Sequence, residues 1–150
     1  MTGITDLMLA KAPVIDEILP AFFAFAGSAD ETIIVAHNAP FDLSFLKSAA
    51  KELDLEWPKY KTLDTVTIAR QVLSKEDVPN CKLSTLAQFF GTKTEPNHRA
   101  LDDAKATTEI LHGLIERLGS FEVYDVDSLM EFAKTAAHIQ RQNYWGLSSI

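Results

Sequence analysis

A short apolar run that passes directly into a polar turn strongly limits how this chain can fold. Residues 32–36 read T-I-I-V-A, and a β-branched run of this length is typical of a strand that is buried on both faces. Helical periodicity begins at Phe41 and continues to about Leu53, so residues 37–40 are expected to form a strand-to-helix turn. The sequence therefore predicts an α/β protein with a ligand site at the carboxyl end of this strand.

Further helices and one further strand are predicted around this unit. Apolar periodicity places helices at residues 5–10, 13–25, 66–73, 82–90, 98–118 and 127–142, and a strand at 61–65. Pro20 predicts a kink or restart in the second helix, and Gly91 is expected to end the helix at 82–90. Thr5 is expected to cap the first helix, and Asp127 or Ser128 the last. The helix at 98–118 is expected to be the longest.

Length and composition predict a single domain with one core and no membrane-spanning segment. At 150 residues and 47% hydrophobic content, the chain can bury one core. No run approaches the roughly 18 apolar residues of a membrane span, and no secretory signal follows Met1. A single cysteine, Cys81, fits a reducing cytoplasm, where we expect the protein. The net charge of −7 argues against a protein that coats nucleic acid, because such a protein needs clustered Lys and Arg. Any contact with DNA or RNA is therefore expected to be local, at a cleft that takes a strand end.

The first motif is H-N-A-P-F-D, which occupies the expected turn. Asp42 falls in the first turn of the following helix, where backbone N–H groups favour its ionised form. An anionic carboxylate is a suitable ligand for magnesium or manganese. The alternative is that Asp42 only compensates the helix dipole and that Asn38 is only a turn residue. Phe41 is expected to pack in the core under either interpretation.

The second motif is N-H-R-A-L-D-D, at the entrance to the helix at 98–118. His98 and Asp103 are five residues apart, so an entry-loop side chain and one from the second turn can face the same cleft. Histidine is well suited to taking a proton from water near neutral pH. The alternative is that His98 is a cap or a surface residue. One of Asp102 and Asp103 is expected to be only a solvated helix charge.

Taken in order, the two motifs and their flanking elements resemble those of the DnaQ-like (DEDDh) 3′ to 5′ exonucleases. The similarity is to the branch of the epsilon subunit of bacterial DNA polymerase III. It also includes T-G-I-T at residues 2–5, A-H-N-A-P-F-D-L-S-F-L at 36–46 and K-L-S-T-L-A at 82–87, and covers residues 2–118.

The resemblance implies a ribonuclease H-like exonuclease fold and specific roles for five residues. Asp42 and Asp103 match metal ligands, His98 matches the general base, and Asn38 and Phe41 are assigned to substrate binding. The implied reaction is hydrolysis of the terminal phosphodiester of DNA or RNA with two Mg²⁺ or Mn²⁺ ions, which releases a nucleoside 5′-monophosphate. The implied partners are a nucleic acid 3′ end and a DNA polymerase or repair assembly.

The chain departs from the family pattern because it lacks the first motif, an Asp-x-Glu on the first strand. The fold is therefore expected to be N-terminally incomplete, with its first three strands missing, and the exonuclease domain to span residues 1–119. Met1 is interpreted as an internal methionine or an artificial start. We expect this fragment to be inactive, and to self-associate through the exposed edge of its sheet.

Residues 120–150 are expected to form a C-terminal helix and a connector-like tail. This segment, with Gln140, Arg141, Tyr144 and Trp145, resembles the connector of bacterial proteins that join an epsilon-like exonuclease to a GIY-YIG endonuclease. A simpler interpretation is an amphipathic helix with a frayed end. Three functions thus stay open: an exonuclease domain, alone or fused to an endonuclease; a non-catalytic nucleic-acid-binding or interaction module; and another metal phosphoesterase.

Overall fold

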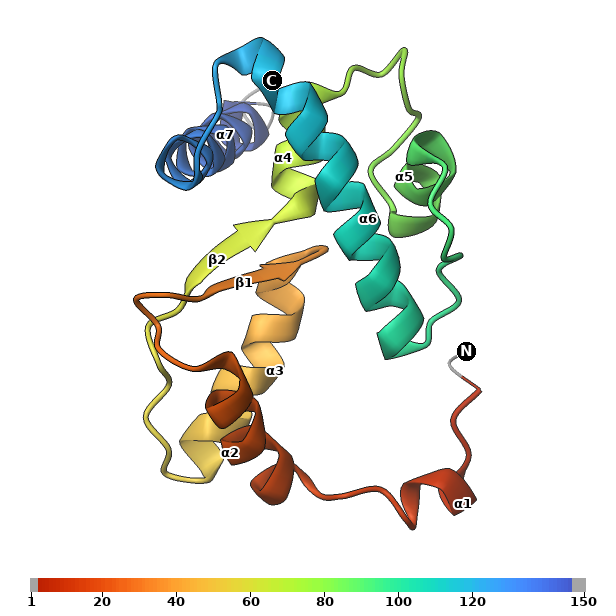
Figure 1. Cartoon of the computed structure of the whole chain (residues 1–150), viewed down its shortest axis with the longest axis vertical. Coiled ribbons are helices and arrows are strands. Elements are labelled where there is room, and N and C mark those ends of the chain that lie inside the picture. Colours follow the sequence, from red (N-terminus) through yellow and green to blue (C-terminus); the bar gives the residue numbers. More distant parts are fainter. Residues whose placement is uncertain (1–2, 147–150) are drawn as a thin grey trace.

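Two short parallel strands lie at the centre of the molecule (Figure 1). The computed structural model describes residues 3–146, without the side chains of residues 137, 138 and 140–146. Strand β1 (Ile33–Ala36) pairs with β2 (Lys61–Asp64), and Val35 lies opposite Leu63. Helix α3 (Ala39–Glu52) connects them, so the predicted α/β unit is confirmed. The sequence expectations for Met1, Gln140, Arg141, Tyr144 and Trp145 fall outside the described side chains.

The prediction that the first strand is buried on both faces is wrong. All four residues of β1 are only partly buried. Ile33 and Val35 pack against the main core, but the sheet of the described residues has two strands, so each strand is also an edge. An edge strand leaves one row of backbone groups and part of its side chains accessible to solvent.

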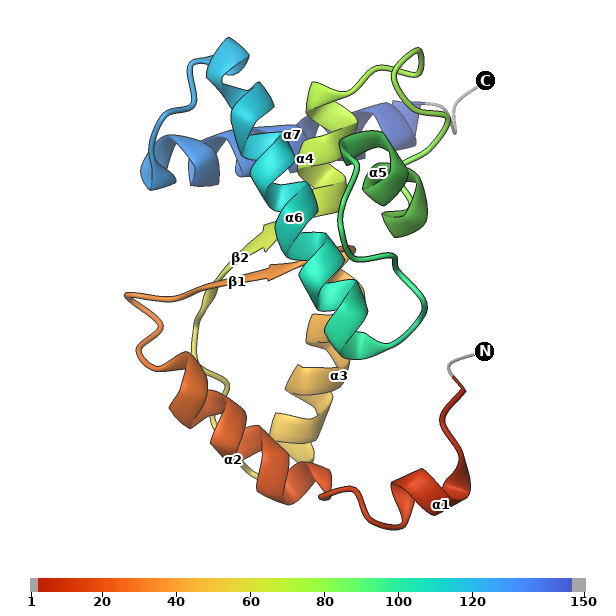
Figure 2. The same ribbon diagram turned by 45° about the vertical axis from the view of Figure 1, so that its right-hand side comes forward.

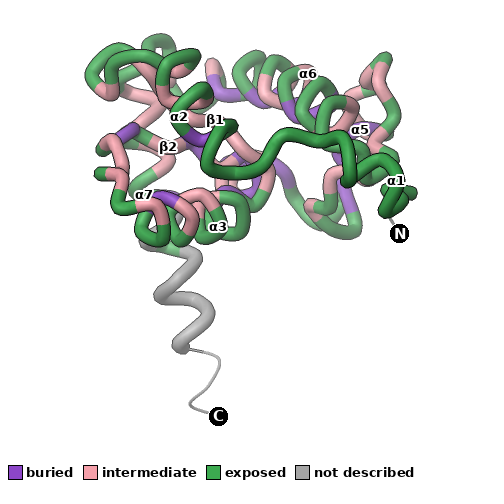
Figure 3. The backbone as a smooth tube through the Cα atoms, turned by 90° about the horizontal axis from the view of Figure 1, so that it is seen from below, coloured by how far each residue is buried: buried purple, intermediate pink, exposed green. Residues whose placement is uncertain are grey.

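The main core lies on one side of the sheet and is built mostly from helices. Its elements are α4 (Thr65–Val72), α5 (Leu83–Phe90), α6 (Ala100–Leu118) and α7 (Val126–Gly146). Its most completely buried side chains are Leu63, Ile68, Leu86, Ile110, Leu114 and Leu118. Figure 1 shows α6 between α4 and α5, and Figure 2 shows α7 crossing behind α4 and α6. Figure 3 shows buried segments along α5, α6 and α7. Gly113 allows the close approach of α5 and α6, because a Cβ there would collide with the Phe90 ring.

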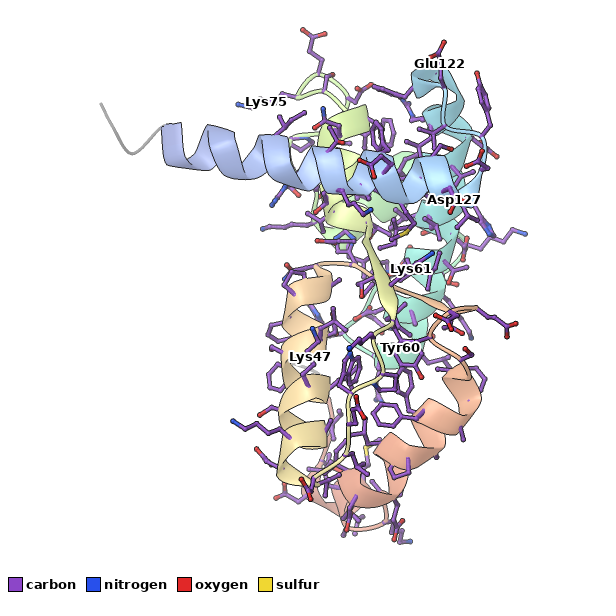
Figure 4. The ribbon with its side chains drawn as sticks, turned by 90° about the vertical axis from the view of Figure 1, so that its left-hand side faces the viewer. Lys47, Tyr60, Lys61, Lys75, Glu122 and Asp127 are labelled. Carbon is purple, nitrogen blue, oxygen red and sulfur yellow. The ribbon has the colours of Figure 1, made fainter. Side chains whose placement is uncertain are left out.

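A second, smaller packing unit lies on the other side of the sheet. Helix α2 (Ile15–Ala26) packs against α3, and the Trp57 ring makes edge contacts with Phe23 at 5.6 Å and with Tyr60 at 5.9 Å. The Tyr60 hydroxyl donates to the Gly27 carbonyl at 3.1 Å. Figure 4 shows Tyr60 between α2 and α3 at the start of β2. The aromatic side chains thus connect α2 to the segment that leads into β2.

Helix α2 runs without interruption through Pro20, so the expected restart does not occur. Its buried residue is Leu19, whereas Val14, Ile18 and Phe25 are exposed, Phe25 to 89%. The short helix α1 (Asp6–Leu9) is capped as predicted, since Thr5 Oγ1 accepts the Met8 N–H at 3.4 Å. The N-terminal part of the described chain therefore presents a row of apolar side chains to solvent.

Two expectations for the C-terminal part are wrong. Helix α7 has 21 residues and α6 has 19, so α7 is the longer helix. The cap of α7 is Asp125 and not Asp127 or Ser128, because Asp125 Oδ1 accepts the Ser128 N–H at 2.7 Å. Helix α6 ends at Leu118, and the 3₁₀ turn η1 (Gly119–Phe121) follows it. Within the part of the chain that the structure describes, no helix is long and apolar enough to span a bilayer.

Candidate functional site

The carboxyl ends of both strands meet at one edge of the sheet, because the strands are parallel and Ala36 lies opposite Asp64. A helix follows each strand almost directly. His37 follows β1 and leads into α3, and Thr65 follows β2 and is the first residue of α4. We call these two points the helix entrances. In open α/β sheets this edge is where ligands bind. The predicted turn at residues 37–40 is thus placed where a site is expected, although α3 already begins at Ala39.

Asp64 joins the two helix entrances. Its Oδ1 accepts the Val66 N–H at 3.0 Å, which caps α4, and also the Asn38 N–H at 2.9 Å. Asn38 has a left-handed backbone with φ 69° and ψ 50°, a conformation that asparagine tolerates better than most residues. The prediction that Asn38 is a turn residue is confirmed, and the turn depends on a carboxylate from the neighbouring strand.

His37 is half-buried and hydrogen-bonded through both ring nitrogens. Nε2 lies 3.0 Å from the Cys81 carbonyl oxygen, and Nδ1 lies 2.8 Å from Thr65 Oγ1. A carbonyl oxygen can only accept, so Nε2 carries the proton and Nδ1 of the neutral ring accepts from the hydroxyl. Burial lowers the pKa of His37, although the Cys81 carbonyl and the charge of Asp64 act in the opposite direction. His37 is the first residue of the H-N-A-P-F-D motif, but the sequence alone predicts no role for it.

Asp42 lies in the first turn of α3, as predicted, and its side chain is exposed. The expectation that Phe41 packs in the core is wrong, because 61% of this residue is exposed. Its ring makes an edge contact with the equally exposed Phe45, at 5.0 Å between centroids. The two rings lie on a side of α3 that no other described element covers, so they are free to contact a ligand.

Four hydrogen bonds fix the loop that leads into α6. Asp103 Oδ1 accepts the N–H groups of Asn97 at 3.1 Å and of His98 at 3.3 Å. Asn97 Nδ2 donates to Asp102 Oδ2 at 2.8 Å, and Asn97 Oδ1 accepts the Arg99 N–H at 2.9 Å. The expectation that one aspartate is only a solvated charge is wrong, since both hold the loop.

His98 is exposed and, like Asn38, has a left-handed backbone, with φ 65°. The sequence places the helix start at His98, but α6 begins at Ala100 and His98 belongs to the loop before it. The imidazole is therefore accessible from solvent, as a general base must be. His98 and Asp103 are brought into one hydrogen-bonded turn, as their spacing suggests.

The structure does not gather these candidates into a complete metal site. Among the described residues, no three His, Cys, Asp or Glu side chains cluster closely enough to hold a metal ion. Asp42 stands on α3, and Asp103 uses one oxygen to hold the loop before α6. A site for two divalent ions needs more carboxylate ligands than these two residues supply. The described residues thus do not fit a pair of ions by themselves.

Comparison with protein families identifies the chain. The family model RNase T, described as an exonuclease family, matches residues 1–111, which include both motifs, at residues 37–42 and 97–103. The chain belongs to the RNase T exonuclease family. This membership confirms the resemblance found from the motifs and agrees with a ribonuclease H-like exonuclease domain of mixed helices and a small sheet. It places the domain among exonucleases, in a family that generally uses divalent metals.

Curated relatives of this RNase T family member are much longer proteins. A protein of Mycobacterium tuberculosis, named as a bifunctional exonuclease/endonuclease, is 45% identical over 94% of the chain and 21% of its own length. DNA polymerase III of the PolC type is 43% identical in Caldanaerobacter subterraneus and 38% in Clostridium perfringens, over 86% and 87% of the chain. The chain spans about a fifth of the first relative and 9% of each polymerase.

Proposed function

We propose that this domain is a 3′ to 5′ exonuclease of the DEDDh type, which removes nucleotides from the 3′ end of DNA or RNA. The observation that carries this proposal is the turn in which Asp103 Oδ1 binds the His98 N–H, within the region matched by the exonuclease family. The turn keeps a carboxylate and an accessible imidazole together at the entrance to one helix.

Each candidate residue has a distinct role in this proposal. His98 takes the proton from the attacking water, since its ring is exposed and can reach solvent. Asn38 and Phe41 contact the terminal nucleotide: Asn38 offers an amide at the strand end, and Phe41 offers an exposed ring face on which a base can stack. Asp42 and Asp103 contribute carboxylate oxygens to the binding of Mg²⁺ or Mn²⁺.

The chain alone should nevertheless turn over little substrate, because its described residues supply too few ligands for two ions. The test is the release of nucleoside 5′-monophosphate from a 3′-labelled oligonucleotide of DNA or RNA, with Mg²⁺ or Mn²⁺. Adding a family-like segment that carries the Asp-x-Glu motif should produce activity, and His98→Ala should remove most of it. Turnover by the chain alone, lost in His98→Ala, would contradict the expected inactivity. No activity in the completed form would contradict the proposed function.

A second proposal concerns the larger protein. The similarity to the bifunctional exonuclease/endonuclease covers 94% of the chain and therefore includes much of the segment after Leu118. We propose that α7 connects the exonuclease domain to an endonuclease domain in a cytoplasmic repair protein. The polymerase relatives support the alternative, a proofreading partner of a DNA polymerase. A non-catalytic binding module is favoured if the completed form binds oligonucleotides without cleaving them.

A further inference from the structure

Two neighbouring side chains at the end of β2 hold the turn at the end of β1. Asp64 Oδ1 is shared between the Val66 N–H at 3.0 Å and the Asn38 N–H at 2.9 Å. Thr65 is fully buried, and its hydroxyl lies 2.8 Å from His37 Nδ1 and 3.3 Å from the Ala36 carbonyl. These contacts join residues that are 26 to 29 positions apart in the chain.

His37 extends the connection to a third segment. Its Nε2–H donates to the carbonyl of Cys81, in the loop that precedes α5. The Thr65 hydroxyl has a single proton, which it donates to Nδ1 of the neutral ring at 2.8 Å in preference to the Ala36 carbonyl at 3.3 Å. The ring is thereby fixed between the start of α4 and the loop before α5, and His37 immediately precedes Asn38.

A helix cap alone does not need this arrangement, as a second cap in the same molecule shows. Asp125 caps α7 through the Ser128 N–H and hydroxyl, which are both local contacts. Asp64 also caps its own helix, but uses the same oxygen to bind the Asn38 N–H of another strand end. This additional bond acts on a residue whose left-handed backbone is otherwise unfavourable. The bond from Asp64 to Asn38 thus stabilises the turn that precedes Asp42.

We propose that His37, Asp64 and Thr65 are positioning residues, which fix the left-handed turn at Asn38 and thereby set the placement of Asn38 and Asp42. The importance of this placement rests on the proposed function, in which Asn38 meets the substrate and Asp42 binds a divalent ion. The network itself is a property of the fold.

The experiment compares Asp64→Ala with Asp125→Ala, since both remove a helix cap but only Asp64 contacts the turn. NMR first measures amide hydrogen exchange in the whole chain. A second NMR measurement, with Mn²⁺ alone, records how strongly the ion broadens the amide signals of residues 38–42. In Asp64→Ala we expect Asn38 exchange to quicken about tenfold or more relative to core amides, because an exposed N–H loses a charged acceptor. Asp64→Asn, which keeps an acceptor oxygen, should restore part of the protection. Asp125→Ala should leave Asn38 exchange unchanged.

The outcomes separate the network from the function. Unchanged Asn38 exchange in Asp64→Ala overturns the proposal. If Asp64→Ala does not fold, the protonation of the His37 ring in the unaltered chain decides the outcome. A proton on Nε2 supports the network, and a proton on Nδ1 alone overturns it, because Nε2 could then not donate to the Cys81 carbonyl. Mn²⁺ broadening that weakens in Asp64→Ala and persists in Asp125→Ala supports the positioning of Asp42. Absence of broadening in the unaltered chain contradicts the metal role of Asp42 but leaves the exchange result, and with it the network, intact.

Discussion

Asp103 accepts the backbone N–H of His98 at 3.3 Å, so the candidate ligand shapes the loop that carries the candidate base. The same oxygen binds the Asn97 N–H at 3.1 Å. A change at position 103 therefore affects both the charge of the site and the conformation of residues 97 and 98. A change at position 98 removes an imidazole but leaves the backbone N–H and its bond in place.

This asymmetry predicts different kinetic effects in an active enzyme that contains the domain. His98→Ala should lower turnover by about 10²–10⁴ and leave the Mn²⁺ concentration for half-maximal activity unchanged, because a general base acts on a proton. Asp103→Asn should raise that Mn²⁺ concentration, because the site loses a charged oxygen. Metal titrations of steady-state rates measure both effects. The assigned roles are wrong if His98→Ala abolishes metal binding while Asp103→Asn leaves it intact.

The partial burial of His37 predicts a pH-dependent stability. Its pKa is lowered in the folded state, so just below pH ~6.5 the unfolded chain binds more protons than the folded chain. The free energy of unfolding should therefore fall as the pH falls through this window, by less than about 1.4 kcal/mol per pH unit for one group, and level off below the folded pKa. The carboxyl groups of Asp77, Glu109 and Asp125 also have lowered pKa values, but they affect the free energy of unfolding at more acidic pH.

Urea denaturation between about pH 5 and 7 measures this dependence. His37→Gln should flatten it, since glutamine does not titrate. His112→Gln, at an exposed position of α6, serves as the control and should keep the slope of the unaltered chain. An equal slope in the unaltered chain and in His37→Gln would show that another group is responsible.

Gly113 provides a stability test that is independent of the site. Gly113→Ala improves helix propensity by about 1 kcal/mol, but the new Cβ collides with the Phe90 ring. Overpacking costs about 1–3 kcal/mol, so we expect a net loss and a Tm lower by about 2–4 °C. Combining Gly113→Ala with Phe90→Leu should recover part of the loss. A higher Tm in the single variant would show that α5 moves away without cost.

The exposed apolar side chains of α1 and α2 predict self-association. Leu7 is 76% exposed and Phe25 is 89% exposed, and patches of such residues favour association. Sedimentation velocity should show species larger than the monomer as the concentration rises, and the double variant Leu7→Ser, Phe25→Ser should reduce them. Leu101→Ser, at an exposed position on α6, is the matched control and should have less effect. A monodisperse monomer with a cooperative thermal transition would contradict this prediction.

Much of the fold could be predicted because its signals are local. The β-branched run at residues 32–36 and the second strand at 61–65 are reproduced within one residue at each end. Gly91 ends α5 with φ 64°, as its lack of a side chain suggests. The burial of β1 and the exposure of Phe41 could not be predicted, because they depend on which other elements cover these residues. Local periodicity indicates which side of an element is apolar and not what packs on it.

The candidate site divides in the same way. Asp42 and the five-residue spacing of His98 and Asp103 are visible in the sequence, as is their position at helix entrances. The connections from Asp64 to Asn38 and from His37 to Thr65 and Cys81 join segments 26, 28 and 44 residues apart. No local pattern predicts such pairs. The register of β1 on β2 brings Asp64 and Thr65 to the turn, and the position of the loop before α5 brings Cys81 to His37. Asp64 and Thr65 stand next to each other in the sequence, but nothing around them indicates these partners.

The left-handed backbone at Asn38 and His98 has a consequence for how the domain responds to selection. With φ values of 69° and 65°, both positions would be relaxed by glycine, which adopts this region without a steric penalty. Directed evolution for heat resistance alone should therefore enrich glycine at these positions, above all at 98, where a larger ring is held in this conformation. Such variants would fold better and lose both side chains. Heat-resistant forms of the domain obtained in this way are expected to be poorer nucleases. They would lose the backbone strain at the entrances of α3 and α6 together with the side chains that act there.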